Sequence, residues 1–243
     1  MQNSSTLSQA FREWWCEHRT RQGFPATAAE LTKVLVAFLR DSTPQRERQR
    51  YGDVDYDWDH HVNTTSAAVG WRNRLLGLFH SPYQPTEPTL FREMLEALNL
   101  DFAQYTFIDL GSGKGRTLLM ASEYPFQKVI GVELIPELNE QAQQNIREFQ
   151  STTRKCLNIE SVCQDARTYE FPACPILLYL FNPLSESGLT QVIHNLEHSL
   201  QAHPRPAVIL YHNPLPIHIL DASPQFHRVS VTHQYAIYKT STM

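Results

Sequence analysis

The residues with the clearest chemical potential lie in the sequence Asp-Leu-Gly-Ser-Gly-Lys-Gly that runs from Asp109 to Gly115. Asp109 ends an apolar stretch, and Gly111, Gly113 and Gly115 follow at alternate positions. Glycine has no Cβ atom, so the chain can turn sharply there and a ligand can approach the backbone. Ligands of open α/β sheets bind at the carboxyl ends of the strands. We therefore predict a ligand-binding turn formed by Asp109, the three glycines and Ser112.

The spacing of these glycines separates the turn from two other nucleotide-binding loops. The dinucleotide fingerprint G-x-G-x-x-G places its third glycine one position later than Gly115. The P-loop has four residues between its first glycine and its Gly-Lys pair, and this turn lacks them. A tight turn without a ligand is the competing interpretation. Three glycines cost backbone entropy, which favours a functional role.

Two further carboxylates follow predicted strands. Glu133 ends the apolar stretch 128–133, and a carboxylate at such a place can accept hydrogen bonds from both hydroxyls of a ribose. Asp165 and Ala166 follow another predicted strand over 157–163. Acidic groups at three successive strand ends, Asp109 included, together describe a nucleoside site.

The stretch 178–184, Leu-Tyr-Leu-Phe-Asn-Pro-Leu, ends a fourth predicted strand beside this site. The side-chain oxygen of Asn182 can accept a hydrogen bond from an amine. Pro183 fixes the local backbone and leaves a carbonyl available. We predict that both residues line a pocket for a second reactant, with a structural Asn-Pro turn as the alternative.

The elements that must position these residues begin at about residue 86. Short apolar stretches alternate with amphipathic helical patterns, which predicts βαβ units with right-handed crossovers. The tail 226–240 contains two alternating segments without a helix between them, typical of an antiparallel pair at a sheet edge. The predicted fold is α/β, with a Rossmann-like, mostly parallel seven-stranded sheet and an antiparallel C-terminal strand. The predicted strands cover 105–110, 128–134, 157–163, 176–181 and 207–212, besides the tail.

The first 80 residues have a different, helical pattern. Apolar residues repeat at helical spacing over 8–21 and 27–40, and a third helix is expected over 65–79. The charged run 45–53 between them is interpreted as a solvated linker. We therefore predict a helical N-terminal extension or cap over 1–80, followed by an α/β domain over 81–243.

On these motifs the chain resembles the class I S-adenosylmethionine-dependent methyltransferases over roughly residues 86–240, and in particular an uncharacterised bacterial branch. The start Asp-Leu-Gly-Ser-Gly is also similar to that of the histone-lysine methyltransferases that lack the SET fold. The resemblance implies S-adenosyl-L-methionine as the cofactor, bound by Asp109, the glycine turn and Glu133. It further implies that Asp165 receives the adenine amino group, with the neighbouring backbone at Ala166. A loop before the domain covers the cofactor in such enzymes, which implies the same role for Tyr83 and Thr86. The alternative is a linker stiffened by proline, with Tyr83 at the surface.

The segment at Asn182 is similar to the Asn-Pro-Pro-aromatic motif of amino-group methyltransferases that act on adenine or glutamine. It departs from that motif because one proline is missing and Leu184 replaces the aromatic residue. The methyl acceptor, expected to be a nitrogen of a small molecule, a protein or an RNA, is not identified by the residues. An NAD-dependent oxidoreductase is an alternative, supported by the βαβ pattern and Glu133. A non-catalytic nucleoside-binding scaffold is another, because fold does not establish activity.

Composition narrows the functional class. Lys and Arg number 21 against 25 Asp and Glu, so no strong nucleic-acid signature is present. No apolar stretch reaches the roughly 20 residues of a membrane span. The four cysteines lack the spacing of metal ligands, and we expect no metal site. Reduced cysteines and a polar N-terminus favour a cytoplasmic location. Nothing in the sequence addresses the oligomeric state.

Overall fold

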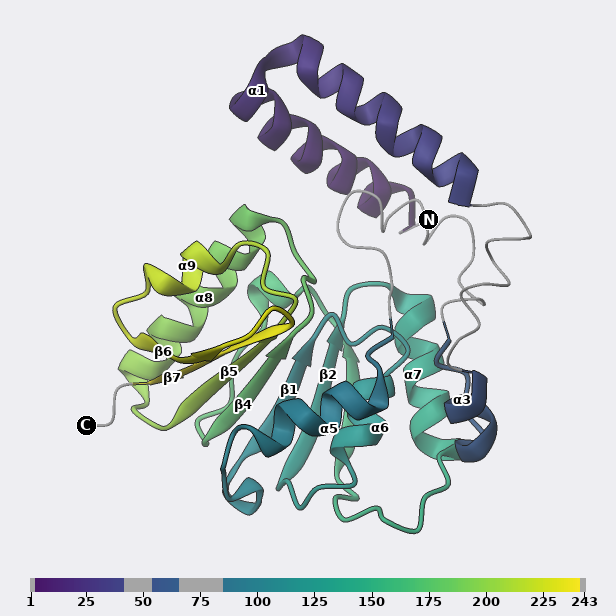
Figure 1. Ribbon diagram of the computed structural model, residues 1–243, viewed down its shortest axis with the longest axis vertical. Helices are drawn as coiled ribbons and strands as arrows, with labels where there is room; N and C mark the ends of the chain where they lie inside the picture. The colour runs from purple at the N-terminus through teal and green to yellow at the C-terminus, as the bar shows by residue number, and fades with distance from the viewer. Residues whose placement is uncertain (1–2, 42–53, 66–84, 241–243) are drawn as a thin grey trace. The chain divides into compact units, whose positions relative to one another are not determined.

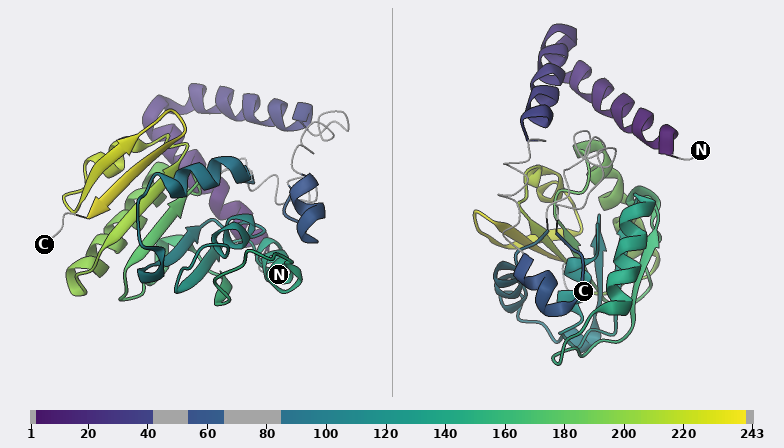
Figure 2. Two further views of the ribbon diagram at one scale, coloured as in Figure 1. Left: turned by 60° about the horizontal axis from the view of Figure 1, so that its bottom comes forward. Right: turned by 90° about the vertical axis from the view of Figure 1, so that its right-hand side faces the viewer.

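The computed structural model describes residues 3–41, 54–65 and 85–240 (Figures 1 and 2). The chain divides into two compact units, residues 1–56 with 65–84 and residues 57–64 with 85–243. The predicted helix over 65–79, the linker over 45–53 and the boundary after residue 80 fall almost entirely outside the described residues.

The first unit contains α1 (Asn3–Asp41), which is two helical segments joined at a kink. Gly23 adopts φ 78° and ψ 169° at the kink, and Pro25 follows two residues later. Glycine tolerates a positive φ, and proline provides no backbone N–H for the helix, so this pair separates the segments. The predicted helices over 8–21 and 27–40 lie on either side of the kink.

The second unit is built on a single seven-stranded sheet with the order β3-β2-β1-β4-β5-β7-β6. Strands β1 to β5 are parallel, and β7 lies antiparallel between β5 and β6. This confirms the predicted fold, including the paired strands at the C-terminal edge. The strands are β1 (Thr106–Leu110), β2 (Lys128–Glu133), β3 (Ile159–Cys163), β4 (Ile176–Leu180), β5 (Ala207–His212), β6 (Phe226–Val231) and β7 (Tyr235–Thr240).

Helices cover both faces of this sheet (Figures 1 and 2). On one face, the ring of Phe91 in α5 contacts Tyr179, the Leu118 side chain of α6 lies against Gly131, and Ser161 donates to Asn139 of α7. The main apolar core lies on the other face, against α8. The helical elements are α3 (Val54–His60), α5 (Pro88–Glu96), η2 (Phe102–Gln104), α6 (Arg116–Ala121), α7 (Pro136–Glu148), η3 (Ala166–Thr168), α8 (Glu186–Ala202) and α9 (Ile217–Asp221).

The strand register brings the predicted site residues together. Asp109 of β1 is the partner of Gly131 in β2 on one side and of Tyr179 in β4 on the other. The chain runs from β1 to β2 and β3 on one side and then returns to β4 on the other side, so the strand order reverses between β1 and β4. Ligands of doubly wound sheets bind at this point. Glu133, two residues beyond Gly131, therefore lies at the same edge of the sheet.

Candidate active site

The glycine turn after β1 has the backbone conformation that only glycine adopts easily. Gly111, Gly113 and Gly115 have φ angles of 81°, 55° and 82°. The N–H groups of Gly111 and Ser112 both donate to the carbonyl of Val132, which fastens the turn to β2. The alternating glycines are thus required by the geometry of the turn, as the sequence predicted.

Two of these glycines also make room for protein atoms. A Cβ atom on Gly111 would lie 2.6 Å from the Cβ of Pro183, and one on Gly115 would lie 3.1 Å from that of Ala142. The Ser112 side chain is buried against Gly131, and its hydroxyl has no hydrogen-bond partner in the described part of the chain. The turn is therefore wedged between β2, α7 and the segment after β4.

The Glu133 side chain is hydrogen-bonded to the glycine turn. Its Oε2 accepts from the Gly113 N–H and its Oε1 from the Ile135 N–H, both at 2.8 Å. The side chain is buried, which raises the pKa of its carboxyl, and these backbone hydrogen bonds act in the opposite direction. Each carboxylate oxygen has a second lone pair, so the group can accept two further hydrogen bonds. This suits the two hydroxyls of a ribose.

Asp109 lies beside Glu133 in the same buried environment. Burial raises the pKa of Asp109 to about 7, opposed by a hydrogen bond from the Thr117 hydroxyl and assisted by the charge of Glu133. A buried carboxyl with this pKa gains from a cationic partner, because an opposite charge favours its ionised form. The pair can therefore receive a ligand that carries hydroxyls and a positive charge.

Asp165 and Ala166 lie at the start of η3, just after β3. The Asp165 side chain caps this helix by accepting from the Arg167 N–H at 2.9 Å. Its carboxylate also receives the Arg167 guanidinium, with Nη2 at 2.6 Å from Oδ2. Asp165 is half-buried, and Ala166 is buried. The predicted adenine contacts of these two residues stay a prediction.

Asn182 and Pro183 follow β4. Asn182 has φ 45°, its Nδ2 donates to the carbonyl of Asn213, and its Oδ1 accepts from the Tyr211 hydroxyl at 2.9 Å. The amide is thus held in one orientation, and its oxygen keeps one lone pair for another donor. Pro183 packs against Gly111. The predicted acceptor segment and the predicted cofactor turn are therefore in contact.

Tyr179, within the stretch 178–184, and His212, which was not predicted to belong to the site, connect this site to Thr86. The Tyr179 hydroxyl lies 2.8 Å from the Thr86 hydroxyl and 2.8 Å from Nδ1 of His212. All three residues are buried. A repeated pattern offered a signal for His212, since Phe-Asn-Pro-Leu at 181–184 recurs as His-Asn-Pro-Leu at 212–215, at the end of the next strand. Tyr83, the other residue predicted before the domain, lies outside the described residues.

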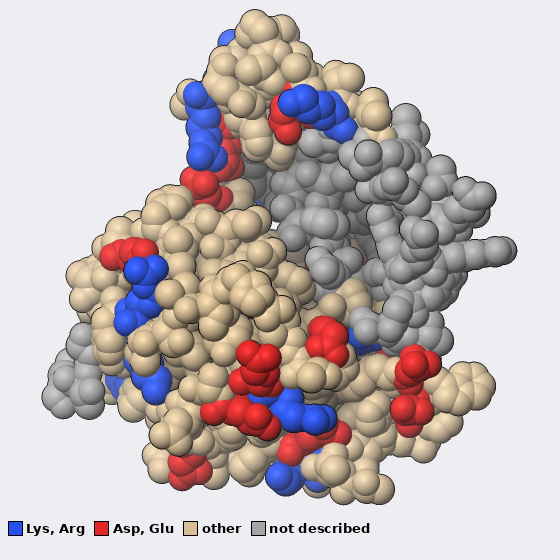
Figure 3. Space-filling model, viewed as in Figure 1, with Lys and Arg blue, Asp and Glu red and all other residues tan. Residues whose placement is uncertain are grey.

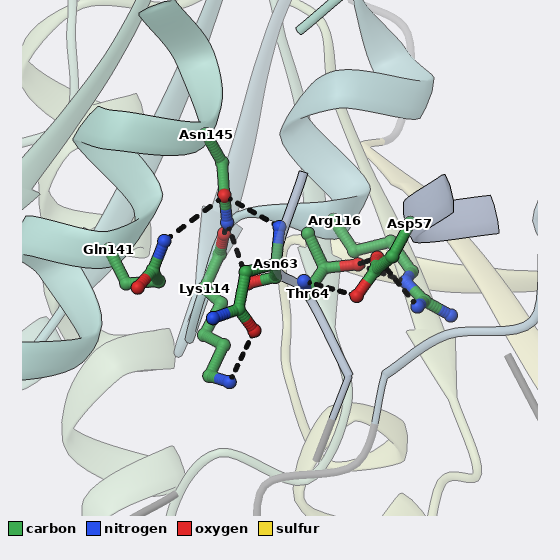
Figure 4. A network of polar contacts seen from close by, with 7 residues as sticks. All are labelled: Asp57, Asn63, Thr64, Lys114, Arg116, Gln141 and Asn145. Carbon is green, nitrogen blue, oxygen red and sulfur yellow. Dashed lines mark hydrogen bonds and ion pairs between the residues drawn. The ribbon is translucent and has the colours of Figure 1, made fainter. Parts of the chain in front are cut away.

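The segment 57–64, which was not predicted to belong to the site, is joined to the glycine turn by Asn145 (Figure 4). Its Nδ2 donates to the carbonyls of Asn63 and Lys114, and its Oδ1 accepts from the Asn63 N–H. The three distances are 2.9, 2.8 and 2.9 Å. Because Lys114 lies within the glycine turn, Asn145 links this turn to the segment 57–64.

The same segment is held by a buried ion pair (Figure 4). Arg116, which follows the turn directly, donates from Nε to the Thr64 hydroxyl at 2.6 Å and from Nη2 to Asp57 at 3.2 Å. The Thr64 N–H and hydroxyl both donate to the Asp57 carboxylate. Burial lowers the pKa of the neighbouring Lys114 to about 8, although Asp57 opposes this shift. Sequence patterns gave no sign of this network, because its partners are distant along the chain.

Residues 3–41, 54–65 and 85–240 contain neither a helix able to span a membrane nor a cluster of metal ligands. No helix there has both the length and the apolar character to cross a bilayer. No group of three or more His, Cys, Asp or Glu side chains is arranged to hold a metal ion there. Basic and acidic side chains are interspersed on the face drawn in Figure 3.

Comparisons with known proteins found one matching family model and several similar solved structures. The family model of the histone methylation protein DOT1 matches residues 80–159, which contain the glycine turn and Glu133. Among solved structures, the chain is similar to an RNA methyltransferase from Salinibacter ruber in complex with S-adenosyl-L-homocysteine. The identity is 21%, the match covers 65% of this chain and 92% of that chain, and the TM-score is 0.43.

Two other solved structures are similar at lower identity. A TehB-like S-adenosylmethionine-dependent methyltransferase from Corynebacterium glutamicum is 17% identical, over 62% of this chain and 87% of that one, with a TM-score of 0.45. A putative methyltransferase from Escherichia coli is 14% identical, over 67% and 92%, with a TM-score of 0.49. No curated protein matches the sequence.

Proposed function

We propose that this chain is a Rossmann-like S-adenosylmethionine-dependent methyltransferase that transfers the methyl group to a nitrogen atom of its acceptor. The observation that carries the proposal is the contact between two segments, the glycine turn at Gly111 and the Asn-Pro segment at Pro183. One segment is suited to a nucleoside cofactor, and the other presents an amide oxygen. Their contact supports a single site in which both reactants meet.

The residues present fit the cofactor. Glu133 would accept the ribose hydroxyls with the lone pairs that its backbone partners leave available. Asp109 would face the positive charge of the methionine end, which favours its ionised form. Gly111, Ser112, Gly113 and Gly115 would provide backbone, as would Ala166, and Asp165 would receive the adenine amino group. When bound, the cofactor supplies an electrophilic methyl carbon on a sulfonium.

Thr86 and Tyr83 would cover the methionine end of the cofactor. Thr86 is buried immediately before α5, and its hydroxyl already lies in hydrogen-bond contact with Tyr179 of β4. A threonine hydroxyl can accept one hydrogen bond and donate another. Its proton is therefore suited to the methionine carboxylate.

The acceptor nitrogen would be oriented by Asn182 and Pro183. The Asn182 oxygen is fixed by Tyr211 and Asn213, which suits it to accept an N–H from the acceptor. The nitrogen lone pair would then point at the methyl carbon, and such alignment accounts for much of the rate enhancement in bimolecular reactions. The acceptor is a small molecule, a protein or an RNA.

Two alternatives predict different binding. An NAD-dependent oxidoreductase is disfavoured, because the dinucleotide fold has the strand order 3-2-1-4-5-6 and this sheet inserts an antiparallel β7 beside β5. A non-catalytic scaffold would bind the nucleoside without transfer. We also infer a cytoplasmic location, supported by cysteines that form no disulfide among the described residues.

Calorimetry with S-adenosylmethionine, S-adenosylhomocysteine and NAD tests the cofactor, with Glu133→Ala as the control. We expect the two sulfur nucleosides to bind the wild type alone, and NAD to bind neither protein. Transfer of a tritiated methyl group into separated small-molecule, protein and RNA fractions of a cell extract then tests the acceptor. Chromatography of the labelled products then separates methylated amines from methyl ethers and esters, and label found only in ethers or esters would contradict transfer to nitrogen. Binding without any label would support the scaffold, and binding of NAD alone would contradict the methyltransferase.

A further inference from the structure

The ends of β4 and β5 form one paired structure. Phe181, Asn182 and Pro183 follow β4, and Asn213 and Pro214 follow His212, the last residue of β5. Asn182 and Asn213 have φ angles of 45° and 49°. The Asn182 amide donates to the Asn213 carbonyl. The rings of Phe181 and His212 stack with their centroids 3.8 Å apart and an interplanar angle of 24°. His212 therefore occupies a fixed place directly beside the acceptor segment.

The His212 ring has one nitrogen engaged and one available. Nδ1 lies 2.8 Å from the Tyr179 hydroxyl, and Nε2 has no hydrogen bond to any residue in the described parts of the chain. The ring is buried, and burial lowers the pKa of His212 to about 4, so the imidazole is neutral near pH 7. A neutral ring adds no second positive charge beside a sulfonium.

The two hydrogen bonds that join Thr86, Tyr179 and His212 can have either of two donor directions. Each hydroxyl has a single proton to donate. If Tyr179 donates to His212, the imidazole proton is on Nε2. If Nδ1 of His212 donates to Tyr179, then Tyr179 donates to Thr86, and Nε2 carries a lone pair. The direction is thus decided by whatever receives the Thr86 proton.

We propose that the cofactor sets this direction, and that His212 is a residue that binds the methyl acceptor. The inference rests on the proposed function, in which the Thr86 hydroxyl donates to the methionine carboxylate. Thr86 then accepts from Tyr179, Tyr179 accepts from Nδ1–H of His212, and Nε2 accepts an N–H of the acceptor. His212 and Asn182 together would hold the acceptor nitrogen, and only after the cofactor is bound.

The transfer step balances with His212 neutral throughout. The lone pair of the acceptor nitrogen forms the new N–C bond, and the C–S bond breaks with its electron pair going to sulfur. The products are neutral S-adenosylhomocysteine and a protonated amine, which releases its extra proton to water. His212 orients the N–H and takes up no proton.

Nitrogen NMR of ¹⁵N-histidine-labelled protein tests the proton direction without an acceptor. The His212 signal is assigned by its absence in His212→Gln. With S-adenosylhomocysteine bound, we expect His212 to be protonated on Nδ1 and unprotonated on Nε2. In Tyr179→Phe, we expect the His212 tautomer to be the same with and without the ligand. A proton on Nε2 in the complex would overturn the inference. Absence of S-adenosylhomocysteine binding by calorimetry would instead contradict the proposed function itself.

A matched pair of variants tests the acceptor contact. In sinefungin an amine-bearing carbon replaces the methylsulfonium, so its amine probes the place of the methyl group. His212→Gln keeps a polar atom near the Nε2 position, and His212→Asn keeps one near Nδ1. A hydrogen bond from a charged donor corresponds to roughly a tenfold change in affinity or more.

We expect S-adenosylhomocysteine to bind the wild type, His212→Gln and His212→Asn, which shows that the variants fold, and the preference for sinefungin is measured relative to S-adenosylhomocysteine in each protein. The preference for sinefungin should fall about tenfold in His212→Asn and persist in His212→Gln. A preference that is equal in the three proteins, or that persists in His212→Asn and falls in His212→Gln, would assign His212 a structural role only and overturn the inference.

Discussion

A Cβ atom on Gly111 would lie 2.6 Å from the Cβ of Pro183. This places the glycine turn after β1 and the Asn-Pro segment after β4 in direct contact, although the two residues are far apart in the sequence. Gly111 also has φ 81°, so the position is closed to other residues for two separate reasons.

Gly111→Ala should destabilise the protein by about 3 kcal/mol, from a left-handed backbone at about 1–2 kcal/mol and overpacking at about 1–3 kcal/mol. Urea unfolding measures the effect. Pro183→Gly removes the clashing atom, so the double variant should be more stable than the sum of the single effects. If the changes in unfolding free energy of the two single variants add up to that of the double variant, the side chain at position 111 does not clash with Pro183.

Glu133→Gln should weaken binding of S-adenosylhomocysteine by about tenfold or more. The amide nitrogen of glutamine accepts no hydrogen bond, so it would face either the Gly113 or the Ile135 N–H and lose ribose contacts. Calorimetry gives the dissociation constants. Glu140→Gln, an exposed substitution on α7, is the control. Equal affinities of the two variants for S-adenosylhomocysteine would contradict the proposed contact between Glu133 and the ribose.

The pKa of Asp109, raised to about 7, predicts a pH-dependent stability in the absence of cofactor. Between the ordinary pKa of an aspartate and this raised pKa, the folded protein keeps the Asp109 proton that the unfolded chain has lost. The contribution of protonated Asp109 to the free energy of unfolding is therefore fully present below about pH 4 and is lost as the pH rises through about 7. Compared with Asp109→Asn, the wild type should lose stability over this range by at most about 1.4 kcal/mol per pH unit. Unfolding at several pH values checks this, with exposed Asp59→Asn as the control. A constant difference between wild type and Asp109→Asn would show that the pKa is ordinary.

Asn145→Ala should destabilise the protein by about 3 kcal/mol, because each buried polar group left without a partner costs about 1–3 kcal/mol. The Asn63 and Lys114 carbonyls and the Asn63 N–H would lose their shared partner. Urea unfolding measures the loss, and hydrogen exchange at the Asn63 amide reports release of the segment. Gln144→Ala, on the exposed side of α7, should change neither. Unchanged exchange at Asn63 in Asn145→Ala would mean that the other contacts of the segment, such as those of Arg116 and His60, hold it without Asn145.

The sequence by itself determined the fold class and the local form of the glycine turn. Apolar strands and amphipathic helices have periods that can be counted along the chain, and positive φ angles at alternate residues require glycine. Acidic residues at strand ends, such as Glu133, were found for the same reason. The C-terminal pair β6 and β7 could also be predicted, since the sequence offers no helix to join them as parallel strands.

Only the tertiary structure decided which distant residues meet. Thr86 contacts Tyr179 across 93 positions, and Asn63 contacts Asn145 across 82. These contacts depend on strand order and register, which place β4 between β1 and β5 and bring His212 beside Phe181. Local patterns encode which face of an element is buried, but not which element lies against it. The hydrogen-bond chain to His212 and the bracing of the turn by Asn145 arise from that second level of organisation.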